Sequence, residues 1–180
     1  MSKYLHSLTD KKANILSTAL QLFANEGFAA TSTSSVAKKA GVSEALIFRH
    51  FKNKKGLLDA IFEQGEKKFM EFMGPILLQN SPKEIIKKTL ELPFSVDESE
   101  YAFWRLQMKL KWDSAYYNPN KMAPLTDKLI EAFKKLGAKH PEFEAKALNQ
   151  LVESISLSLV RGELKDKQQY LDFLFGKYRV

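Results

Sequence analysis

The sequence predicts an all-α protein of about nine helices, arranged as a three-helix N-terminal head and a longer helical C-terminal part. Three observations support this fold class. Apolar residues recur at three- and four-residue intervals, and no stretch alternates apolar and polar residues long enough to make a strand. Capping residues precede these segments, and glycine or proline follows most of them. The 180 residues, 44% hydrophobic and 27% charged, have the composition of a globular protein.

Positive charge is concentrated at the N-terminal end of the chain. The first 56 residues hold nine of the 28 Lys and Arg residues but three of the 21 Asp and Glu residues, which gives them +6 of the net charge of +7. This asymmetry indicates a head that binds a polyanion on a nearly neutral body. A solvated basic surface without a ligand is the alternative interpretation.

The composition excludes several classes of protein. Because cysteine is absent, we expect no disulfide, no thiolate catalysis and no cysteine-bound zinc. No apolar run approaches the ~18 residues of a membrane span, and the first residues lack the apolar core of a signal peptide. We therefore expect a cytoplasmic protein with no membrane partner.

Four helices are predicted in and after the head. The first runs from about Thr9 to Asn25 and ends at Gly27, which can adopt the left-handed conformation of a C-terminal cap. The other three are a short helix that is capped by Ser32 or Thr33 and ends at Gly41, a helix from Glu44 to His50 capped by Ser43, and a helix that starts at Lys54 after the cap Asn53 and stops at Gly74-Pro75.

The remaining segments predict five further helices. They are a helix opened by Ser81-Pro82 and ended by Pro93, one from Asp97 to Trp112, one that reaches Lys135, one from His140-Pro141 to about Arg161, and one from Gln168 to Lys177.

The second and third helices form a helix-turn-helix pattern over residues 35–47. Ala37 and Ala40 are small enough for the two helices to cross closely, and Gly41 allows a tight turn. With Ile47 and Phe51 facing inward, a different set of residues faces outward on the third helix. These outward residues are Glu44, Ala45, Phe48 and Arg49. A helix of this width fits the major groove of DNA.

Two lysines open the fourth helix, where positive charge opposes the helix macrodipole. Exposed cations in this position cost about 0.3–1 kcal/mol each. Lys54 and Lys55 are therefore predicted to bind an anion together with the free N–H groups of the first turn, and a DNA phosphate fits this description. A pair of surface lysines without a ligand is the alternative.

The residues of this region resemble those of a known family. Four runs have the order and spacing found in the N-terminal domain of TetR-type (TetR/AcrR) transcriptional regulators. The runs are Gly27-Phe28-Ala29-Ala30-Thr31-Ser32-Thr33 through Val36-Ala37, then Ala40-Gly41-Val42-Ser43, then Ile47-Phe48-Arg49-His50-Phe51, and then Lys52-Asn53-Lys54-Lys55-Gly56-Leu57-Leu58. The resemblance covers about residues 11–69, and the remainder is similar only in being helical and of suitable length.

The resemblance implies a homodimeric repressor whose two third helices enter successive major grooves of a palindromic operator in double-stranded DNA. It also implies that the C-terminal helices bind a small-molecule effector, which releases the protein from DNA. The expected domains are a DNA-binding domain over residues 9–56, a connecting fourth helix over 54–73, and a ligand-binding and dimerisation domain over 57–180. The residues expected at the DNA are Thr33, Val42, Ser43, Glu44, Ala45, Phe48, Arg49, His50, Lys54 and Lys55.

Three positions depart from the family pattern. Glu44 occupies a position that is basic or neutral in many relatives, and an acid near phosphates is unfavourable unless it accepts a hydrogen bond from a cytosine amino group. Ala45 replaces a frequent glycine, so the backbone approaches DNA less closely. Phe48 replaces a frequent tyrosine and loses a hydroxyl that would reach a phosphate, but it can still contact a thymine methyl group. Arg49 is expected to contact either a base edge or a phosphate.

An aromatic face on the helix over residues 97–112 predicts an effector pocket. Its residues recur every four positions and therefore share one side of the helix. The residues expected to line the pocket are Trp104, Met108, Trp112 and Tyr116, with Met70 and Met73 on the opposite wall. Ligand sites between helices are usually lined in this way, so we predict an apolar or amphiphilic effector. Ordinary core packing of these side chains is the alternative.

Two apolar stripes near the C-terminus predict a dimer interface. Each stripe offers more apolar surface than a chain of this size easily covers, and a symmetric four-helix bundle would bury both. The residues are Leu148, Leu151, Val152, Ile155, Leu159, Leu171, Leu174, Phe175 and Tyr178. Packing within one chain is the alternative.

Enzymatic function is not expected. Ser43 and His50 are seven residues apart on one helix, which separates their Cα atoms by about 10.5 Å along the axis, too far for a nucleophile and its base. The histidines lack metal-ligand spacing and no glycine-rich phosphate loop is present, so we expect no metal and no cofactor. The competing hypothesis is a helical small-molecule-binding or partner-binding protein without specific operator recognition.

Overall fold

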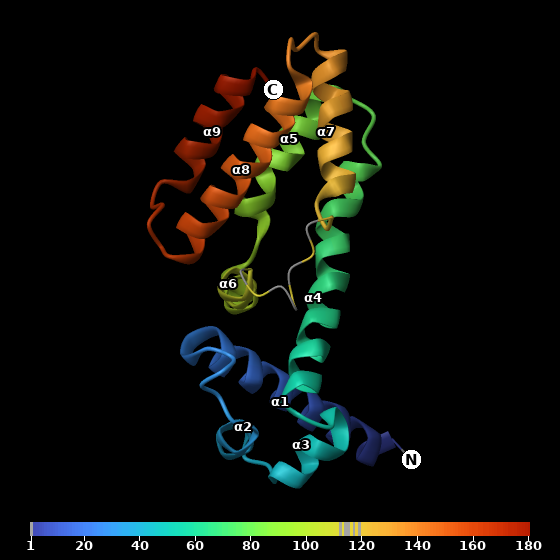
Figure 1. The fold of residues 1–180 in the computed structure, drawn as a ribbon, viewed down its shortest axis with the longest axis vertical. Coiled ribbons are helices and arrows are strands. Elements are labelled where there is room, and N and C mark those ends of the chain that lie inside the picture. Colours follow the sequence, from blue (N-terminus) through green and yellow to red (C-terminus); the bar gives the residue numbers. More distant parts are fainter. Residues whose placement is uncertain (1, 112, 114–115, 117, 119) are drawn as a thin grey trace. The chain divides into compact units, whose positions relative to one another are not determined.

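The computed structural model in Figure 1 describes residues 2–111, 113, 116, 118 and 120–180 of the chain. Over these residues the chain forms nine α-helices, two short 3₁₀ helices and no strand. The prediction of an all-α fold with about nine helices is therefore confirmed. The α-helices are α1 (Ser2–Glu26), α2 (Thr33–Ala40), α3 (Glu44–Phe51), α4 (Lys54–Leu77), α5 (Pro82–Glu91), α6 (Tyr101–Leu110), α7 (Ala123–Lys135), α8 (Pro141–Val160) and α9 (Lys167–Tyr178), and the 3₁₀ helices are η1 (Leu92–Ser95) and η2 (Glu98–Glu100).

The helices fall into two compact units, each with its own hydrophobic core. The head unit contains the described residues of 1–68 and 102–116, and the C-terminal unit contains those of 69–101 and 117–180. This division differs from the predicted boundary between residues 56 and 57, because it assigns the first part of α4 and most of α6 to the head unit. Among the described residues, no helix is long and apolar enough to cross a membrane.

Local sequence signals set the ends of the helices in the head unit. Gly27 (φ +98°) and Gly41 (φ +67°) adopt the left-handed conformation and follow the last residues of α1 and α2. Three side chains accept hydrogen bonds from backbone N–H groups of the first turns, as predicted. They are Ser32 at α2, Ser43 at α3 and Asn53 at α4. Helix α1 extends further toward the N-terminus than predicted, since it begins at Ser2.

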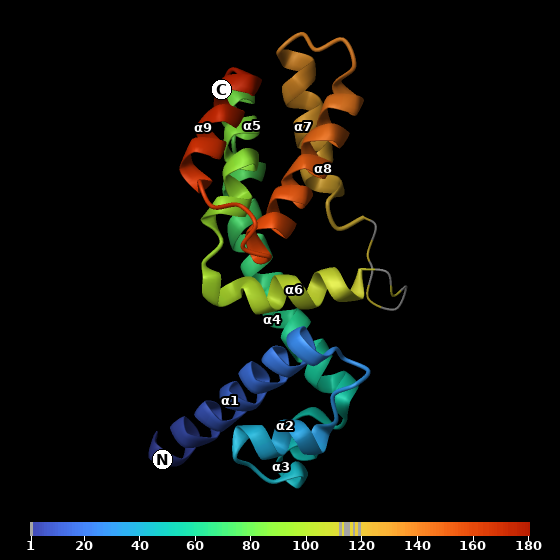
Figure 2. The same ribbon diagram turned by 90° about the vertical axis from the view of Figure 1, so that its left-hand side faces the viewer.

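The core of the head unit joins α6 to the first four helices. Its buried apolar side chains include Ile15, Phe23, Val36, Ile47, Phe51, Leu57, Ile61, Phe103 and Leu106. Figure 2 shows α6 crossing α4. A Cβ atom on Gly65 of α4 would lie 2.6 Å from Cε1 of the Phe103 ring and closer still to Cζ. The ring therefore packs directly on the α4 backbone, which only glycine permits.

The C-terminal unit is a helical bundle built on the last turns of α4. Helix α8 packs on α7 and η1, and α5 packs on α7, α8 and α9. The buried side chains of its core include Met73, Ile76, Ile85, Ile86, Leu90, Leu125, Leu129, Phe133, Leu148, Ile155 and Leu174. Thr89 is also buried, and its hydroxyl donates a hydrogen bond to the Ile85 carbonyl oxygen at 2.7 Å, which removes the cost of burying it.

The predicted end of the fourth helix at Gly74-Pro75 is wrong, because α4 continues to Leu77. Proline inside a helix removes one backbone hydrogen bond and costs about 3 kcal/mol. Burial opposes this cost, since Ile76 is 1% exposed and lies with Met73 in the core of the C-terminal unit. Burying a side chain of this size contributes about 1.5–3 kcal/mol. Burial of Met73 and Ile76 together thus offsets the local cost of the proline.

Most residues predicted to form a dimer interface are buried in the core of a single chain. These residues are Leu148, Val152, Ile155, Leu159, Leu171 and Leu174, each at most 9% exposed. This burial favours packing within one chain, the alternative interpretation of the two stripes, and the contribution of these residues to a dimer interface stays a prediction. Leu151, Phe175 and Tyr178 are partly buried at the edge of this core. An apolar stripe has the same sequence whether its partner belongs to the same chain or to another.

Candidate DNA-binding interface

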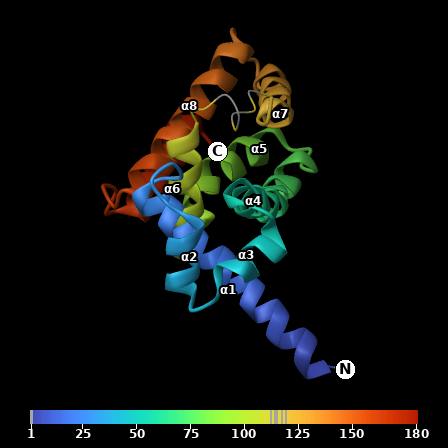
Figure 3. The same cartoon turned by 60° about the horizontal axis from the view of Figure 1, so that its bottom comes forward.

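Helices α2 and α3 form the predicted helix-turn-helix. The turn between them contains the left-handed Gly41, and the Val42 N–H donates to the Ala37 carbonyl oxygen at 3.0 Å. The Asn14 side chain of α1 donates to the Ala40 carbonyl oxygen at 2.9 Å and holds the end of α2. Figure 3 shows α2 and α3 next to each other beside α1. These contacts hold the end of α2 and the turn that leads into α3, which is the helix that enters the major groove in a helix-turn-helix.

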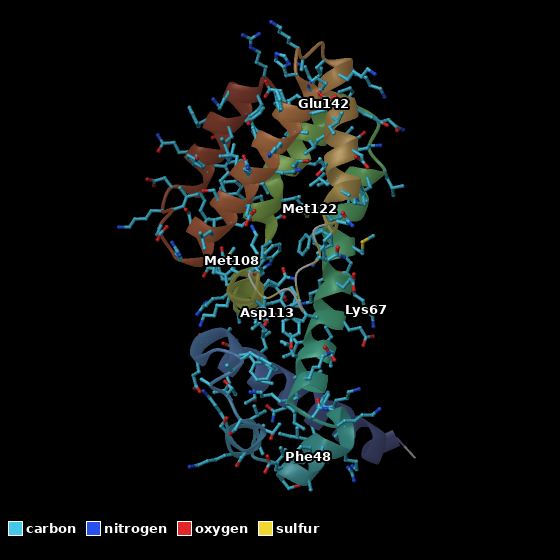
Figure 4. The ribbon with its side chains drawn as sticks, in the orientation of Figure 1. Phe48, Lys67, Met108, Asp113, Met122 and Glu142 are labelled. Carbon is cyan, nitrogen blue, oxygen red and sulfur yellow. The ribbon has the colours of Figure 1, made fainter. Side chains whose placement is uncertain are left out.

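Burial separates an inward and an outward side of α3. Ile47 and Phe51 lie in the core of the head unit, whereas Ala45, Phe48 and Arg49 are exposed together with the cap Ser43. Phe48 is 45% exposed and is labelled near the end of the head unit in Figure 4. Such a ring, presented beside an arginine, is suited to contact a thymine methyl group. Three further predicted contact residues are half-buried, and these are Val42, Glu44 and His50.

A hydrogen bond connects the first turns of α2 and α3. The Thr33 hydroxyl donates to Glu44 Oε1 at 2.6 Å, and both side chains are partly buried. Hydrogen bonds to a carboxylate are about twice as strong as neutral ones, so this contact holds the Glu44 side chain in place. The sequence did not reveal the pair, because eleven residues separate its members and no helical period connects them.

The two lysines that open α4 have partners within the chain. Lys54 Nζ donates to the carbonyl oxygens of Phe28 and Ala29 at 2.9 and 3.2 Å and lies 4.6 Å from the centroid of the Phe28 ring. Lys55 forms an ion pair with Asp59 at 2.7 Å, and the hydrogen bond to Asp59 raises the pKa of the Lys55 ammonium group. Lys54 therefore ties the start of α4 to the loop before α2. Its contact with a DNA phosphate stays a prediction and can use the remaining N–H of the ammonium.

His50 is the least accessible of the predicted contact residues near the end of α3. Its ring centroid lies 6.0 Å from that of Phe51. Its Nε2 atom is buried and has no hydrogen-bond partner among the described residues. Contact with DNA would have to involve other atoms of this side chain. Within the same described residues, no cluster of histidine and acidic side chains could hold a metal ion.

Two cations of α6 bind the C-terminal end of α1. The Arg105 guanidinium donates to Asn25 Oδ1 at 2.9 Å, and Lys109 Nζ donates to the Asn25 carbonyl oxygen at 3.0 Å. Helix C-termini carry unsatisfied carbonyls and partial negative charge, so cations there are favourable. Sequence reasoning missed this contact because about 80 residues separate the partners. The contact fixes the end of α1, from which the chain runs to the helix-turn-helix.

The residues predicted to line an effector pocket are divided between the two units. Trp104 and Met108 are partly buried in the head unit, and Tyr116 packs there against Phe62 and Phe28 with ring centroids 6.0 and 6.1 Å apart. In the C-terminal unit, Met73 is a core residue and Met70 is 54% exposed. Trp112 lies outside the described residues. The pocket stays a prediction.

A basic three-helix head that presents a capped helix-turn-helix defines a class of DNA-binding proteins. Residues 15–61 match the family of bacterial regulatory proteins, tetR family. Over 50 residues the chain is 54% identical to the uncharacterized HTH-type transcriptional regulator YvkB of Bacillus subtilis, an alignment that covers 28% of this chain and 26% of that protein. The similarity in sequence to this family is thus confined to the N-terminal part of the chain, which contains the helix-turn-helix.

Solved structures extend the likeness of fold to almost the whole chain. A TetR-like transcriptional regulator from Rhodococcus sp. RHA1 superposes with a TM-score of 0.74 at 22% identity, covering 91% of both chains. AibR, solved in complex with isovaleryl coenzyme A and operator DNA, gives a TM-score of 0.67 at 20% identity over 93% of this chain and 97% of that one. Sequence matches to the curated relatives span between 26% and 40% of those proteins' length.

Proposed function

We propose that this chain is a sequence-specific DNA-binding regulator of transcription, a cytoplasmic repressor that acts as a homodimer. The observation that carries the proposal is the outward face of α3, which presents Phe48 and Arg49 while Ile47 and Phe51 anchor the helix in the core. The first 56 residues, which contain this helix, hold almost all of the excess positive charge. Positive charge supplies sequence-independent affinity for DNA, and an outward-facing recognition helix supplies sequence preference.

Dimerisation uses surface that the core of one chain leaves uncovered. Helix α8 carries Phe143 at 71% exposure and α9 carries Phe173 at 60% exposure, and Leu151 is partly exposed. Large exposed apolar side chains favour burial against a partner. A two-fold axis through such a surface would place two α3 helices on the half-sites of a palindromic operator.

Release from DNA is assigned to a small apolar or amphiphilic effector. Trp104 and Met108 are partly buried on α6, the helix that binds the end of α1 through Arg105 and Lys109. A ligand that shifts α6 would therefore act on the head unit. By linkage, an effector that weakens DNA binding ~100-fold needs about 2.7 kcal/mol of coupling. AibR, which shares the fold, has been solved with both isovaleryl coenzyme A and operator DNA.

The test is a gel-shift titration of the full chain on the DNA upstream of its own gene, in the presence and absence of random-sequence competitor and at several salt concentrations. A specific regulator binds this DNA about 10³-fold or more tightly than the competitor, and both affinities fall as salt rises. Equal affinity for upstream and random DNA would reject operator recognition. It would favour the competing hypothesis of a helical ligand-binding or partner-binding protein.

A further inference from the structure

We infer that Glu44 determines operator specificity by accepting a hydrogen bond from the exocyclic amino group of a cytosine in each half-site. The inference rests on the proposed function, because it requires an operator. Glu44 is an acidic side chain in the first turn of α3, although α3 lies in the most basic part of the chain. A carboxylate on a surface that approaches phosphates is unfavourable unless a specific partner compensates for it.

The structure shows a carboxylate that is held in place and still able to accept. Thr33 occupies Oε1 through a hydrogen bond of 2.6 Å. A carboxylate offers about four acceptor positions, so Oε2 and part of Oε1 remain available. No ion pair of Glu44 with a lysine or arginine is found among the side chains that the structure describes. The Glu44 carboxylate is thus held in place by a neutral hydroxyl and not by a cation.

Its position on α3 places this carboxylate at the face that approaches DNA. Phe48 follows Glu44 by four residues and therefore lies one turn further along the same side of the helix. Phe48 is exposed, and Ala45 beside Glu44 is exposed as well. Glu44 is half-buried, and its side chain accepts the hydrogen bond from Thr33 of α2. If Phe48 contacts one base, the adjacent base lies within reach of Glu44.

The chemistry of the major groove selects the base. Guanine presents two acceptors there and thymine presents one acceptor and a methyl group, and acceptors repel a carboxylate. Adenine presents an amino group beside the acceptor N7, so one carboxylate oxygen gains a bond while the other meets a lone pair. Cytosine presents its N4 amino group without an adjacent acceptor. A side chain that can only accept therefore favours cytosine over the other three bases.

Selection from a pool of randomised duplexes tests this inference with the wild-type chain and the variants E44A, E44Q and T33V. We expect wild type to enrich a two-fold-symmetric site with cytosine at one position of each half. E44A should lose the preference at that position alone, with affinity for the wild-type site about 10-fold lower. E44Q should shift the preference toward adenine, which a glutamine amide reads at N6 and N7. T33V should keep cytosine but with a weaker preference.

The matched control is E26Q, which removes an exposed acidic charge of the head unit outside the helix-turn-helix. Both E26Q and E44Q raise affinity for random DNA through charge alone, whereas only E44Q changes the selected base. A second measurement uses wild-type protein and one chemical change in the selected site. N4-methylcytosine at the identified position still pairs with guanine but presents a methyl group in the major groove, so wild-type binding should weaken about 10-fold and E44A binding should not change.

Failure of the inference and failure of the proposed function give different results. If wild type enriches no common sequence, the proposed function falls. If wild type and E44A enrich the same site with the same preference at every position, Glu44 serves only as a structural link to Thr33 and the inference is overturned. If E44A proves unfolded by circular dichroism, wild-type protein alone decides the question, because equal affinity for the cytosine and N4-methylcytosine sites also overturns the inference.

Discussion

Replacing Gly65 by alanine tests the close packing of α6 on α4, which builds α6 into the head unit. A Cβ atom at this position would lie 2.6 Å from Cε1 of Phe103 and closer still to Cζ. Carbon atoms in contact are normally about 3.5–4.0 Å apart, so the ring must move by more than 1 Å. Phe103 is buried in the head core with Leu106 and Ala102, and this packing resists the movement.

The expected loss of stability follows from two opposing effects. Alanine stabilises a helix interior by about 1 kcal/mol relative to glycine. Overpacking a filled core costs about 1–3 kcal/mol, and the severe overlap with Phe103 puts this site at the upper end. We therefore expect Gly65→Ala to lower the free energy of unfolding by about 1–2 kcal/mol. In a Phe103→Ala background the overlap disappears, and the same substitution should stabilise the protein by about 1 kcal/mol.

Urea unfolding of the wild type, the two single variants and the double variant gives this coupling energy from a double-mutant cycle. We expect a coupling of about 2–3 kcal/mol between the two positions. The Phe103→Ala variant also serves as the control for loss of the ring itself, which should cost about 3–5 kcal/mol. If Gly65→Ala stabilises the wild type as much as it stabilises the Phe103→Ala variant, α6 does not pack on α4 as described.

Four further predictions concern other contacts. Lys54→Ala removes the hydrogen bonds to the loop before α2, so urea unfolding should show a free energy of unfolding lower by about 1–2 kcal/mol. If the variant and the wild type also show the same slope of log DNA affinity against log salt concentration, Lys54 does not contact a DNA phosphate. Pro75→Ala should stabilise the protein by about 1–3 kcal/mol by restoring a helix hydrogen bond, and a loss of stability would refute this. Arg105→Ala should lower the free energy of unfolding by about 0.5 kcal/mol in the wild-type chain and by almost nothing in the Asn25→Ala variant. Burial, with Glu144 as a smaller cause, raises the pKa of Tyr178 above its ordinary value of 10.0. The stability that this group contributes is present below pH 10.0 and is lost as pH rises through the folded-state pKa. Unfolding measured against pH should show this loss in the wild type and not in Tyr178→Phe.

The architecture of the head could be predicted because its signals are local. Ser32, Ser43 and Asn53 cap helices within three residues of their own positions, and Gly41 makes the turn that its missing side chain permits. The inward and outward sides of α3 follow from helical periodicity alone. Each of these features depends on neighbouring residues, so the sequence displays them directly.

The features that the sequence did not show depend on residues far apart in the chain. The bond from Thr33 to Glu44 and the binding of Asn25 by α6 join positions with no common period. The continuation of α4 through Pro75 depends on a core that forms only when other helices pack around it. The apolar stripes of α8 and α9 were visible, but a stripe does not reveal whether its own chain or a partner covers it.

The most direct test of the central claim is a hydroxyl-radical footprint of the full chain on the DNA upstream of its gene. If α3 reads an operator as part of a dimer, two protected regions related by two-fold symmetry appear about 34–36 Å apart along the duplex, or at a multiple of this spacing. Substitution of the outward Arg49 should weaken this protection, whereas Glu26→Gln should preserve it. Uniform cleavage at protein concentrations that saturate binding would show that the chain binds DNA without recognising an operator.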